Sequence, residues 1–192
     1  MLLATFVAVG CGSGRVAPPE PGSSRGSVPD LRGVRVMVLP VQRKIGVRED
    51  VDPELAFALE ERGGGVGWVF PDELAEALAR SPGLDVPLEA LPVGMFLRAE
   101  VNRVGDPLYG YLRRAAAISN AQVALIPVAV RRRTELDGSS VVEVVATLLD
   151  IRSGRVIWFT VVEGQPGAAG DFRTVASAVD AFASALLWYL DG

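Results

Sequence analysis

The sequence contains no histidine, a single cysteine and a single lysine. Without histidine, the chain cannot build a Cys/His zinc site or a catalytic triad in which histidine is the base. With Cys11 as its one cysteine, it cannot form an internal disulfide. A net charge of −4 argues against a nucleic-acid-binding protein, whose binding surface is basic. We therefore expect a protein that is not an enzyme, with no catalytic residues, no cofactor, no metal site and no small-molecule substrate.

The N-terminus carries a short apolar run over residues 2–9. Its eight residues fall within the roughly 7–15 of a signal-peptide core and far below the roughly 20 that cross a bilayer. The run ends at small residues before Cys11, and this pattern resembles a bacterial lipoprotein signal. Ala8 stands where that motif prefers leucine, and no Lys or Arg precedes the run. The alternative is a disordered tail with an incidental cysteine.

The resemblance implies that residues 1–11 are a signal peptide ending at a lipidated Cys11, with palmitate among the acyl chains. Gly12 follows the cysteine where an aspartate would indicate retention in the inner membrane. We therefore expect a protein of the cell envelope, lipid-anchored in the outer membrane and facing the periplasm. Residues 12–32 are rich in Pro, Gly and Ser and predict a flexible tether with a reach of roughly 25 Å.

Residues 33–192 predict a single α/β domain. Apolar, β-favouring runs predict five strands, at 34–41, 66–70, 122–130, 141–150 and 155–162, and the last two form an antiparallel hairpin. Helices are expected from Asp52, which would cap the first, and from residues 71, 106 and 171, with Asn120 ending the third. Pro40 and Pro127 should lie at a strand end, a bulge or an edge. We expect one layered domain with a mixed sheet of about five strands and packed helices; residues 84–104 show no clear period.

The hairpin carries a recognisable turn motif. Its residues are Asp150, Arg152, Ser153, Gly154, Val156 and Trp158. The motif resembles that of the envelope lipoproteins related to CsgG, LpoB and the amino-terminal domain of TolB, with serine at 153 in place of threonine. The resemblance implies a non-catalytic accessory or assembly factor that serves an envelope machine through protein contacts, with an unknown envelope protein as partner. The motif also has a structural explanation, in which Gly154 allows the turn, Asp150 accepts backbone donors and Trp158 covers the sheet.

Other patterns give weaker indications. The run Arg131, Arg132 and Arg133 is a candidate surface for an acidic partner or for phospholipid headgroups, and the alternative is a solvated strand end that blunts edge pairing. A subunit of an oligomeric secretion pore is a second functional hypothesis, because the hairpin 141–163 reaches the 9–11 residues per strand that a bilayer requires. An envelope hydrolase that uses carboxylates is a third, with acids at Asp72, Glu73 and Glu76. The glycines at 63–67 lack the Lys-Ser/Thr of a phosphate-binding loop and predict a plain loop.

Overall fold

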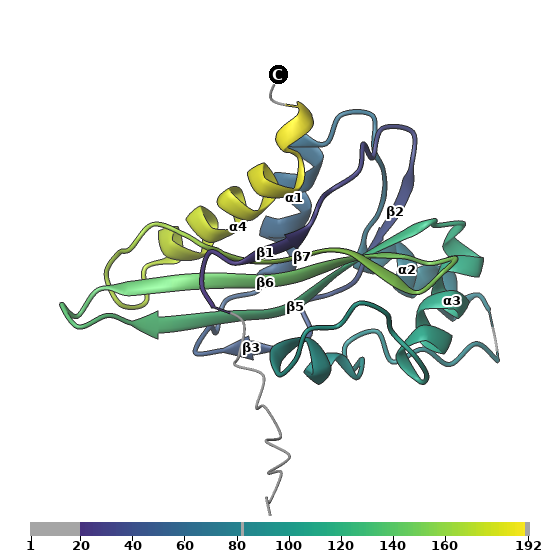
Figure 1. Ribbon diagram of the computed structural model, residues 1–192, viewed down its shortest axis with the longest axis horizontal. Helices are drawn as coiled ribbons and strands as arrows, with labels where there is room; N and C mark the ends of the chain where they lie inside the picture. Colours follow the sequence, from purple (N-terminus) through teal and green to yellow (C-terminus); the bar gives the residue numbers. More distant parts are fainter. Residues whose placement is uncertain (1–19, 82, 191–192) are drawn as a thin grey trace, which may run out of the picture.

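A computed structural model describes residues 20–81 and 83–190. The predicted signal peptide, Cys11 and residues 12–19 of the predicted tether lie outside the described residues. The described chain forms the α/β domain that the sequence predicts, with a mixed sheet and helices on both of its faces (Figure 1).

The sheet has seven strands in the described residues, where the sequence predicts about five. Their order is β1 (Ser24–Gly26), β7 (Arg155–Glu163), β6 (Ser140–Asp150), β5 (Val123–Thr134), β2 (Arg35–Val38) and β4 (Gly67–Val69), with β3 (Lys44–Ile45) paired to β5 further along that strand. The β2–β4, β2–β5 and β3–β5 pairs are parallel. The β1–β7, β7–β6 and β6–β5 pairs are antiparallel, which confirms both the mixed sheet and the C-terminal hairpin.

Helices cover the sheet on both sides (Figure 1). One face packs against α1 (Asp52–Arg62) and α4 (Phe172–Leu186). The other face packs against α2 (Pro71–Ala79), α3 (Leu108–Ser119) and the short 3-10 helix η1 (Val93–Leu97), and a second 3-10 turn, η2 (Trp188–Leu190), follows α4. Strand β2 shows why both faces are apolar, since Val36 and Val38 enter one core and Met37 enters the other.

The helix boundaries confirm most of the predicted signals and correct two. The third predicted helix begins at Leu108 and not at 106, with Pro107 preceding it. Asn120 adopts the left-handed conformation that ends α3, with φ of 54°, as predicted. The Asp171 side chain caps α4 by accepting a hydrogen bond from the Arg173 backbone N–H at 2.9 Å. The prediction that Asp52 caps α1 is wrong. Asp52 is the first helical residue, and its carboxylate accepts a hydrogen bond from the Val41 backbone N–H at 2.7 Å instead.

The prediction of a flexible tether is wrong for the part of residues 12–32 that the structure describes. Strand β1 pairs with the edge of β7, with Ser24 opposite Thr160. Val28 and Leu31 are buried beyond it, and the exposed fraction of Leu31 is 0%. A segment rich in Pro and Gly becomes ordered here because an open sheet edge offers backbone partners and the core takes two apolar side chains. The ordered domain therefore includes residues before 33.

Two further segments differ from the sequence-based expectation. Residues 43–50, where the sequence predicts no strand, contain β3, which has only two residues and pairs with the far end of β5. Residues 84–104, for which the sequence predicts no element, consist of turns and η1. Leu91, Val93 and Phe96 from this segment are buried in the core beneath α2 and α3. Their positions depend on contacts with distant elements, and local periodicity does not encode such contacts.

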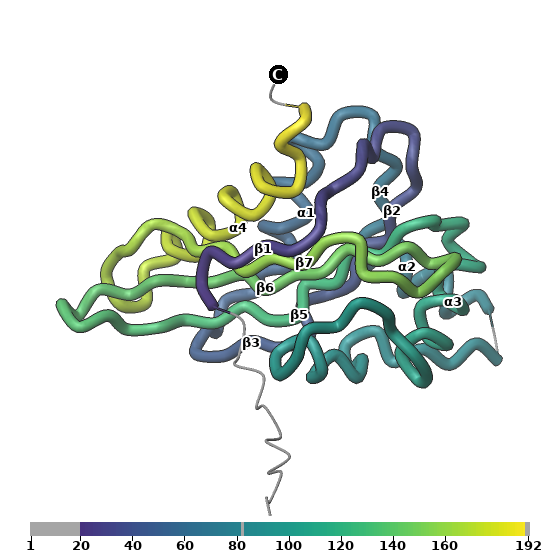
Figure 2. The backbone as a smooth tube through the Cα atoms, in the orientation of Figure 1, coloured from purple at the N-terminus to yellow at the C-terminus, as the bar shows by residue number. Residues whose placement is uncertain are grey.

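Strands β5 and β6 continue past the rest of the sheet as a long hairpin (Figure 2). We call residues 131–143 the arm. A register shift after Pro127 marks the bulge that the sequence predicts there, and Pro40 lies just past the end of β2. At the tip, the Glu135 backbone N–H donates to the Ser139 carbonyl at 2.8 Å and Gly138 adopts a positive φ of 84°. Leu136 projects from this turn and is fully exposed.

Candidate interaction surfaces

The residues of the hairpin motif form the turn between β6 and β7 and pack β7 against the core. One carboxylate oxygen of Asp150 accepts hydrogen bonds from the Ser153 backbone N–H at 2.7 Å and from the Ser153 hydroxyl at 2.5 Å. Gly154 takes a positive φ of 69° in this turn. Trp158 is 4% exposed and stacks on Phe182 of α4, with ring centroids 6.0 Å apart. The motif therefore builds a turn and anchors β7 to the core.

The predicted Arg131–Arg132–Arg133 cluster lies at the base of the arm, and each guanidinium is paired with a carboxylate. Arg131 and Arg133 both donate to the carboxylate of Glu143, which is only 2% exposed. Arg132 donates to Glu49 at 3.0 Å. The three charges are thus matched within the molecule, and the geometry leaves none of them as a free cation on the surface.

Arg133 is the most heavily engaged of the three. Besides Glu143, it contacts Glu135 at 2.9 Å and Glu163 at 2.8 Å. Hydrogen bonds to Glu163 and Glu135 raise the pKa of the Arg133 guanidinium further above its usual range. A role of this cluster in binding headgroups or a partner stays a prediction, and its observed role is to tie the arm to β7.

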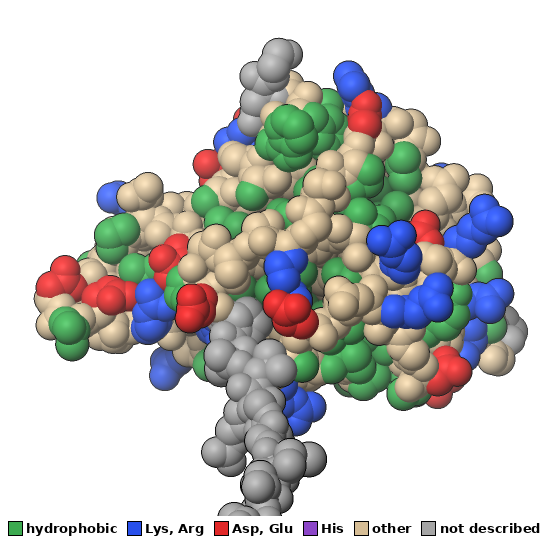
Figure 3. Space-filling model, viewed as in Figure 1, with side chains coloured by type: hydrophobic (Ala, Val, Ile, Leu, Met, Phe, Trp, Pro, Cys, Tyr) green, Lys and Arg blue, Asp and Glu red, His purple; other side chains and the backbone are tan. Residues whose placement is uncertain are grey.

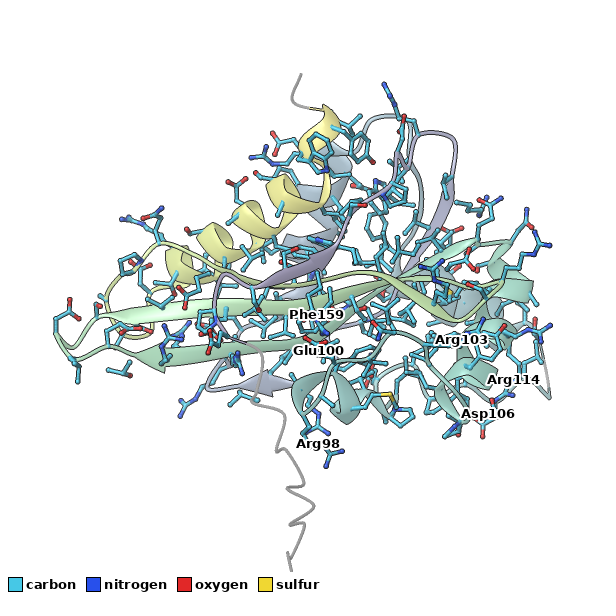
Figure 4. The ribbon with its side chains drawn as sticks, in the orientation of Figure 1. Arg98, Glu100, Arg103, Asp106, Arg114 and Phe159 are labelled. Carbon is cyan, nitrogen blue, oxygen red and sulfur yellow. The ribbon has the colours of Figure 1, made fainter. Side chains whose placement is uncertain are left out.

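A different set of arginines gathers at the end of the molecule opposite the arm. We call this surface the arginine end, and its residues are Arg103, Arg113, Arg114, Arg152 and Arg155. Figure 3 shows basic side chains concentrated there, and Figure 4 shows Arg103 and Arg114 with Asp106 at this end. These side chains come from the stretch before α3, from α3 itself, and from the turn between β6 and β7 together with the first residue of β7.

Backbone pairing and aromatic contacts hold the arginine end together. Arg103 forms an antiparallel bridge with Arg155, which places two like charges directly opposite each other. The Tyr109 hydroxyl donates to the Arg152 carbonyl at 2.9 Å, and the Arg113 guanidinium lies 5.8 Å from the centroid of the Tyr109 ring. Juxtaposed cations of this kind repel one another in the free protein, so an anionic partner would be favoured here.

Carboxylates do not neutralise the arginine end within the described residues. No ion pair joins any of its five guanidinium groups to an acid in residues 20–81 or 83–190. The neighbouring Asp106 accepts a hydrogen bond from the Gly110 backbone N–H, and Asp150 is engaged by Ser153. Sequence reasoning missed this surface because its arginines are scattered over some fifty positions. The adjacent pair Arg113–Arg114 is the one local signal that could have indicated it.

A shallow hollow of about 360 Å³ lies within the arginine end. Gly110 and Ala117 of α3 and Leu84 supply its apolar lining, and Arg113 and Arg114 flank it. Ala117 has a single methyl group, which leaves the outer face of α3 hollow there, whereas the Asp106 carboxylate and the Arg114 guanidinium lie beside Gly110, 3.0 and 3.5 Å from where a Cβ would stand. The hollow therefore combines an apolar floor with two cationic walls.

A larger crevice of about 640 Å³ opens beyond the carboxyl ends of β2 and β4, between the starts of α1 and α2. Ligands commonly bind at this place in open α/β sheets. Asp50, Asp52, Asp72 and Glu89 contribute carboxylates to its lining, together with Lys44. No group of three or more Cys, Asp or Glu side chains in the described part of the chain is arranged to hold a metal ion.

The acids of the crevice have different environments. Burial raises the pKa of Asp52, although its hydrogen bond from the Val41 N–H opposes this effect. The Lys44 ammonium, 3.0 Å from the Asp50 carboxylate, lowers the pKa of Asp50. Of the three acids that the sequence suggested for hydrolysis, Asp72 alone lines the crevice.

The other two suggested acids are engaged on the surface of α2. Glu73 pairs with Arg35 at 3.4 Å, and Glu76 pairs with Arg80 at 3.8 Å. The structure therefore does not bring Asp72, Glu73 and Glu76 together into one catalytic group.

The two C-terminal aromatic side chains have different environments. Trp188 is exposed, whereas the Tyr189 hydroxyl accepts a hydrogen bond from the Leu31 backbone N–H at 3.1 Å. Among the helices of the described residues, none combines the length and the apolar composition needed to cross a bilayer.

Comparison with known proteins yields structural neighbours only. No family model matches the sequence, and no curated protein matches it. A point variant of the PelC dodecamer from Paraburkholderia phytofirmans is 23% identical, with a TM-score of 0.48 over 86% of this chain and 97% of that chain. The lipoprotein GNA1162 from Neisseria meningitidis is 17% identical, with a TM-score of 0.44 over 78% of this chain and 94% of that chain. A protein from Xanthomonas campestris is 17% identical, with a TM-score of 0.28 over 88% of this chain and 90% of that chain. Likenesses of this size establish neither a shared family nor a shared function, and the resemblance to the CsgG, LpoB and TolB group is not confirmed.

Proposed function

We propose that this chain is a lipid-anchored lipoprotein of the cell envelope, in the outer membrane, and that it acts as a non-catalytic accessory or assembly factor through protein contacts. The observation that carries the proposal is the arginine end, a cluster of five arginines that form no ion pair with any acid in the described part of the α/β domain. The N-terminal pattern that ends at Cys11 supports the anchored location. In this proposal the domain presents its charged end to an acidic protein surface while the lipid holds it at the membrane.

The arginine end gives the test of partner binding. Tagged full-length protein is isolated from detergent-solubilised membranes of its host, in parallel with a variant that carries Arg152→Glu and Arg155→Glu. Both side chains are exposed, so these changes should leave the fold intact. Arg173→Glu, an exposed arginine on α4, is the matched control for charge reversal elsewhere. We expect the wild type and the control to recover the same envelope partner in equal amount. The double variant should recover at least tenfold less of it. Equal recovery by all three would refute a role for the arginine end.

The anchor is tested separately. Mass spectrometry of the mature protein should show a diacylglyceryl-modified Cys11 at the N-terminus and no residues 1–10. A Cys11→Ser variant should move from the membrane fraction to the soluble fraction. An unmodified Cys11 in membrane-free wild-type protein would overturn the location without affecting the result at the arginine end.

The crevice at the ends of β2 and β4 favours a second candidate function, the carboxylate-based hydrolase. Asp52, whose pKa burial raises, would serve as the proton donor, and Asp72 would serve as the base. Hydrolysis of chromogenic glycosides or esters should then disappear in both Asp52→Asn and Asp72→Asn and persist in Glu76→Gln. Purified protein without activity on such substrates, or activity that survives both changes, counts against this candidate.

The burial of the hairpin in this fold argues against the secretion-pore alternative. Val144 and Leu148 of β6 are buried in one core, and Val145 and Leu149 are buried in the other. The predicted membrane hairpin 141–163 therefore has no free apolar face along β6 to turn toward lipid. As a pore subunit, the chain would have to use another surface or unfold this one.

A further inference from the structure

The two ends of the molecule carry opposite charge. Around the arm, Glu135, Glu143 and Glu163 pair with Arg131 and Arg133, Glu49 pairs with Arg132, and Asp137 lies at the tip, so carboxylates outnumber guanidinium groups there. The arginine end has the opposite imbalance, with five arginines beside Asp106 and Asp150. In Figure 3, acidic side chains lie over the arm together with a few basic ones, and basic side chains predominate at the far end of the longest axis. The molecule thus has a charge dipole along its length.

The tip of the arm presents an apolar side chain between two acids. Leu136 is fully exposed, with Glu135 before it and Asp137 after it. The Asp137 carboxylate accepts a hydrogen bond from the Ser139 backbone N–H at 2.9 Å, and hydrogen bonds from Ser139 keep the pKa of Asp137 below its usual range. The turn is therefore closed by its own hydrogen bonds, and Leu136 is not needed to hold it. An exposed leucine on an ordered turn is suited to anchor a contact.

The hollow in the arginine end is complementary to this tip. Its apolar floor of Leu84, Gly110 and Ala117 can receive a leucine side chain, and its volume of about 360 Å³ leaves room for the flanking residues. The guanidinium groups of Arg113 and Arg114 flank the hollow, where they can pair with the Asp137 carboxylate beside that leucine, while Glu135 keeps its ion pair with Arg133. Shape and charge thus match between two surfaces of the same chain.

We propose that the arm tip of one copy docks in the hollow of a second copy, with Leu136 as the anchor. The two surfaces lie at opposite ends of the molecule, so the arm tip of a chain cannot reach the hollow of the same chain (Figure 1). The contact is heterologous, and its repetition builds a ring where the rotation between copies closes and an open chain where it does not. The inference rests on the arginine end as a protein-binding surface, as does the proposed function, but it does not depend on the lipid anchor.

The proposed contact is small, so we expect the association to be weak. A turn of five residues in a shallow hollow covers less than the roughly 1,200 Å² of a standard stable interface, so the association should depend on protein concentration. Its charged rim is exposed to solvent and is screened by salt. We expect the apparent dissociation constant to rise several-fold between 50 mM and 500 mM NaCl.

Sedimentation of the full-length chain in detergent tests the proposal with variants on each side of the contact. Leu136→Ser removes the anchor and keeps the hydrogen bonds of the turn. Ala117→Phe fills the hollow from an exposed position on α3, and Ala117→Ser is its matched control. We expect concentration-dependent assembly of the wild type and of Ala117→Ser, and association at least tenfold weaker for Leu136→Ser and for Ala117→Phe. Thermal melts confirm that each variant is folded.

Mixing gives the decisive result. Leu136→Ser retains an intact hollow and Ala117→Phe retains an intact arm, so an equimolar mixture should form a one-to-one dimer and nothing larger. A monomeric wild type at 100 µM would overturn the inference, as would variants that assemble like the wild type or a mixture that stays monomeric. Repeating the measurement with Cys11→Ser separates the two proposals, because self-association should persist without the anchor. If the wild type recovers no envelope partner while its self-association is intact, only the proposed function is refuted.

Discussion

The carboxylate of Glu143 accepts a hydrogen bond from Nε of Arg131 at the point where the arm leaves the sheet. Glu143 is 2% exposed, and the Arg133 guanidinium contacts its other oxygen. A buried carboxylate is tolerated only when cations and hydrogen bonds compensate for its lost hydration. This one is compensated by two arginines that would otherwise repel each other.

Replacement of Glu143 by alanine should destabilise the protein by about 2–3 kcal/mol, because it leaves Arg131 and Arg133 side by side without their shared acid. The estimate lies below the usual cost of breaking a buried pair because both arginines are partly exposed. Urea unfolding followed by circular dichroism measures the change. Glu135→Gln, on the exposed part of the arm, is the control and should cost about 0.5 kcal/mol or less. Equal effects of the two variants would show that burial of Glu143 does not matter.

Leu31 tests whether the segment before residue 33 belongs to the fold. Its side chain is fully buried in the core that contains α1 and α4, so Leu31→Ala should destabilise the protein by about 2–4 kcal/mol. A leucine in a flexible tether would give no change on truncation. Leu136→Ala, at the exposed tip of the arm, is the matched control and should lie within about 0.5 kcal/mol of the wild type. Thermal unfolding of both variants decides between an ordered segment and a tether.

Gly154 in the hairpin motif combines a positive φ with a close approach of side chain and backbone. A Cβ at this position would lie 3.1 Å from the Tyr109 ring and 3.2 Å from the Val104 carbonyl oxygen. Gly154→Ala should therefore cost about 2–3 kcal/mol, of which roughly 1 kcal/mol reflects the backbone conformation. Gly138→Ala at the arm tip has a positive φ and open space around it, so it should cost about 1 kcal/mol. Similar values for the two substitutions in denaturant unfolding would mean that the contact with Tyr109 contributes nothing.

The sequence predicts the elements whose signals are local. Five strands, four helices, the mixed sheet and the proline positions follow from apolar runs, helix-start residues and turn residues. Strands β1 and β3 escape prediction because each is short and is ordered by a partner strand distant in sequence. Asp52 shows the same effect of a distant partner on a single residue. Its place before Pro53 in the sequence is typical of a helix cap, but in the fold its carboxylate accepts a hydrogen bond from the Val41 N–H.

The interaction surfaces were harder to predict than the fold. The most conspicuous basic run, at 131–133, is neutralised by glutamates from β6, β7 and the segment before α1. The arginine end is instead assembled from isolated residues that come together only when residues 102–104 pair with the start of β7. Charge density in a sequence therefore did not indicate where the folded surface is charged, because pairing partners are set by the topology.

The crevice acids allow a test by pH. Asp52 has an ordinary pKa of 3.8 when unfolded, and burial raises the pKa in the folded state. The folded protein then holds this proton to higher pH than the unfolded chain does, so the stabilisation present below pH 3.8 is lost as the pH rises through the folded pKa. Asp52→Asn can keep the hydrogen bond from Val41 without carrying a charge. The stability of the wild type relative to this variant should therefore fall as the pH rises from 3.5 to 7.

Asp50 should show the opposite sign. Lys44 lowers the pKa of Asp50 from 3.8, so its contribution is present above that value and is lost as the pH falls through the folded pKa. The stability of the wild type relative to Asp50→Asn should therefore rise with pH up to about 3.8 and change little above it, whereas the stability relative to Asp52→Asn falls as the pH rises above that value. Urea unfolding of the three proteins at half-unit steps of pH measures both differences. If the two stability differences change in the same direction with pH, either Asp52 is not buried or Asp50 is not paired with Lys44. If Asp52 is not buried, the hydrolase candidate loses its proton donor.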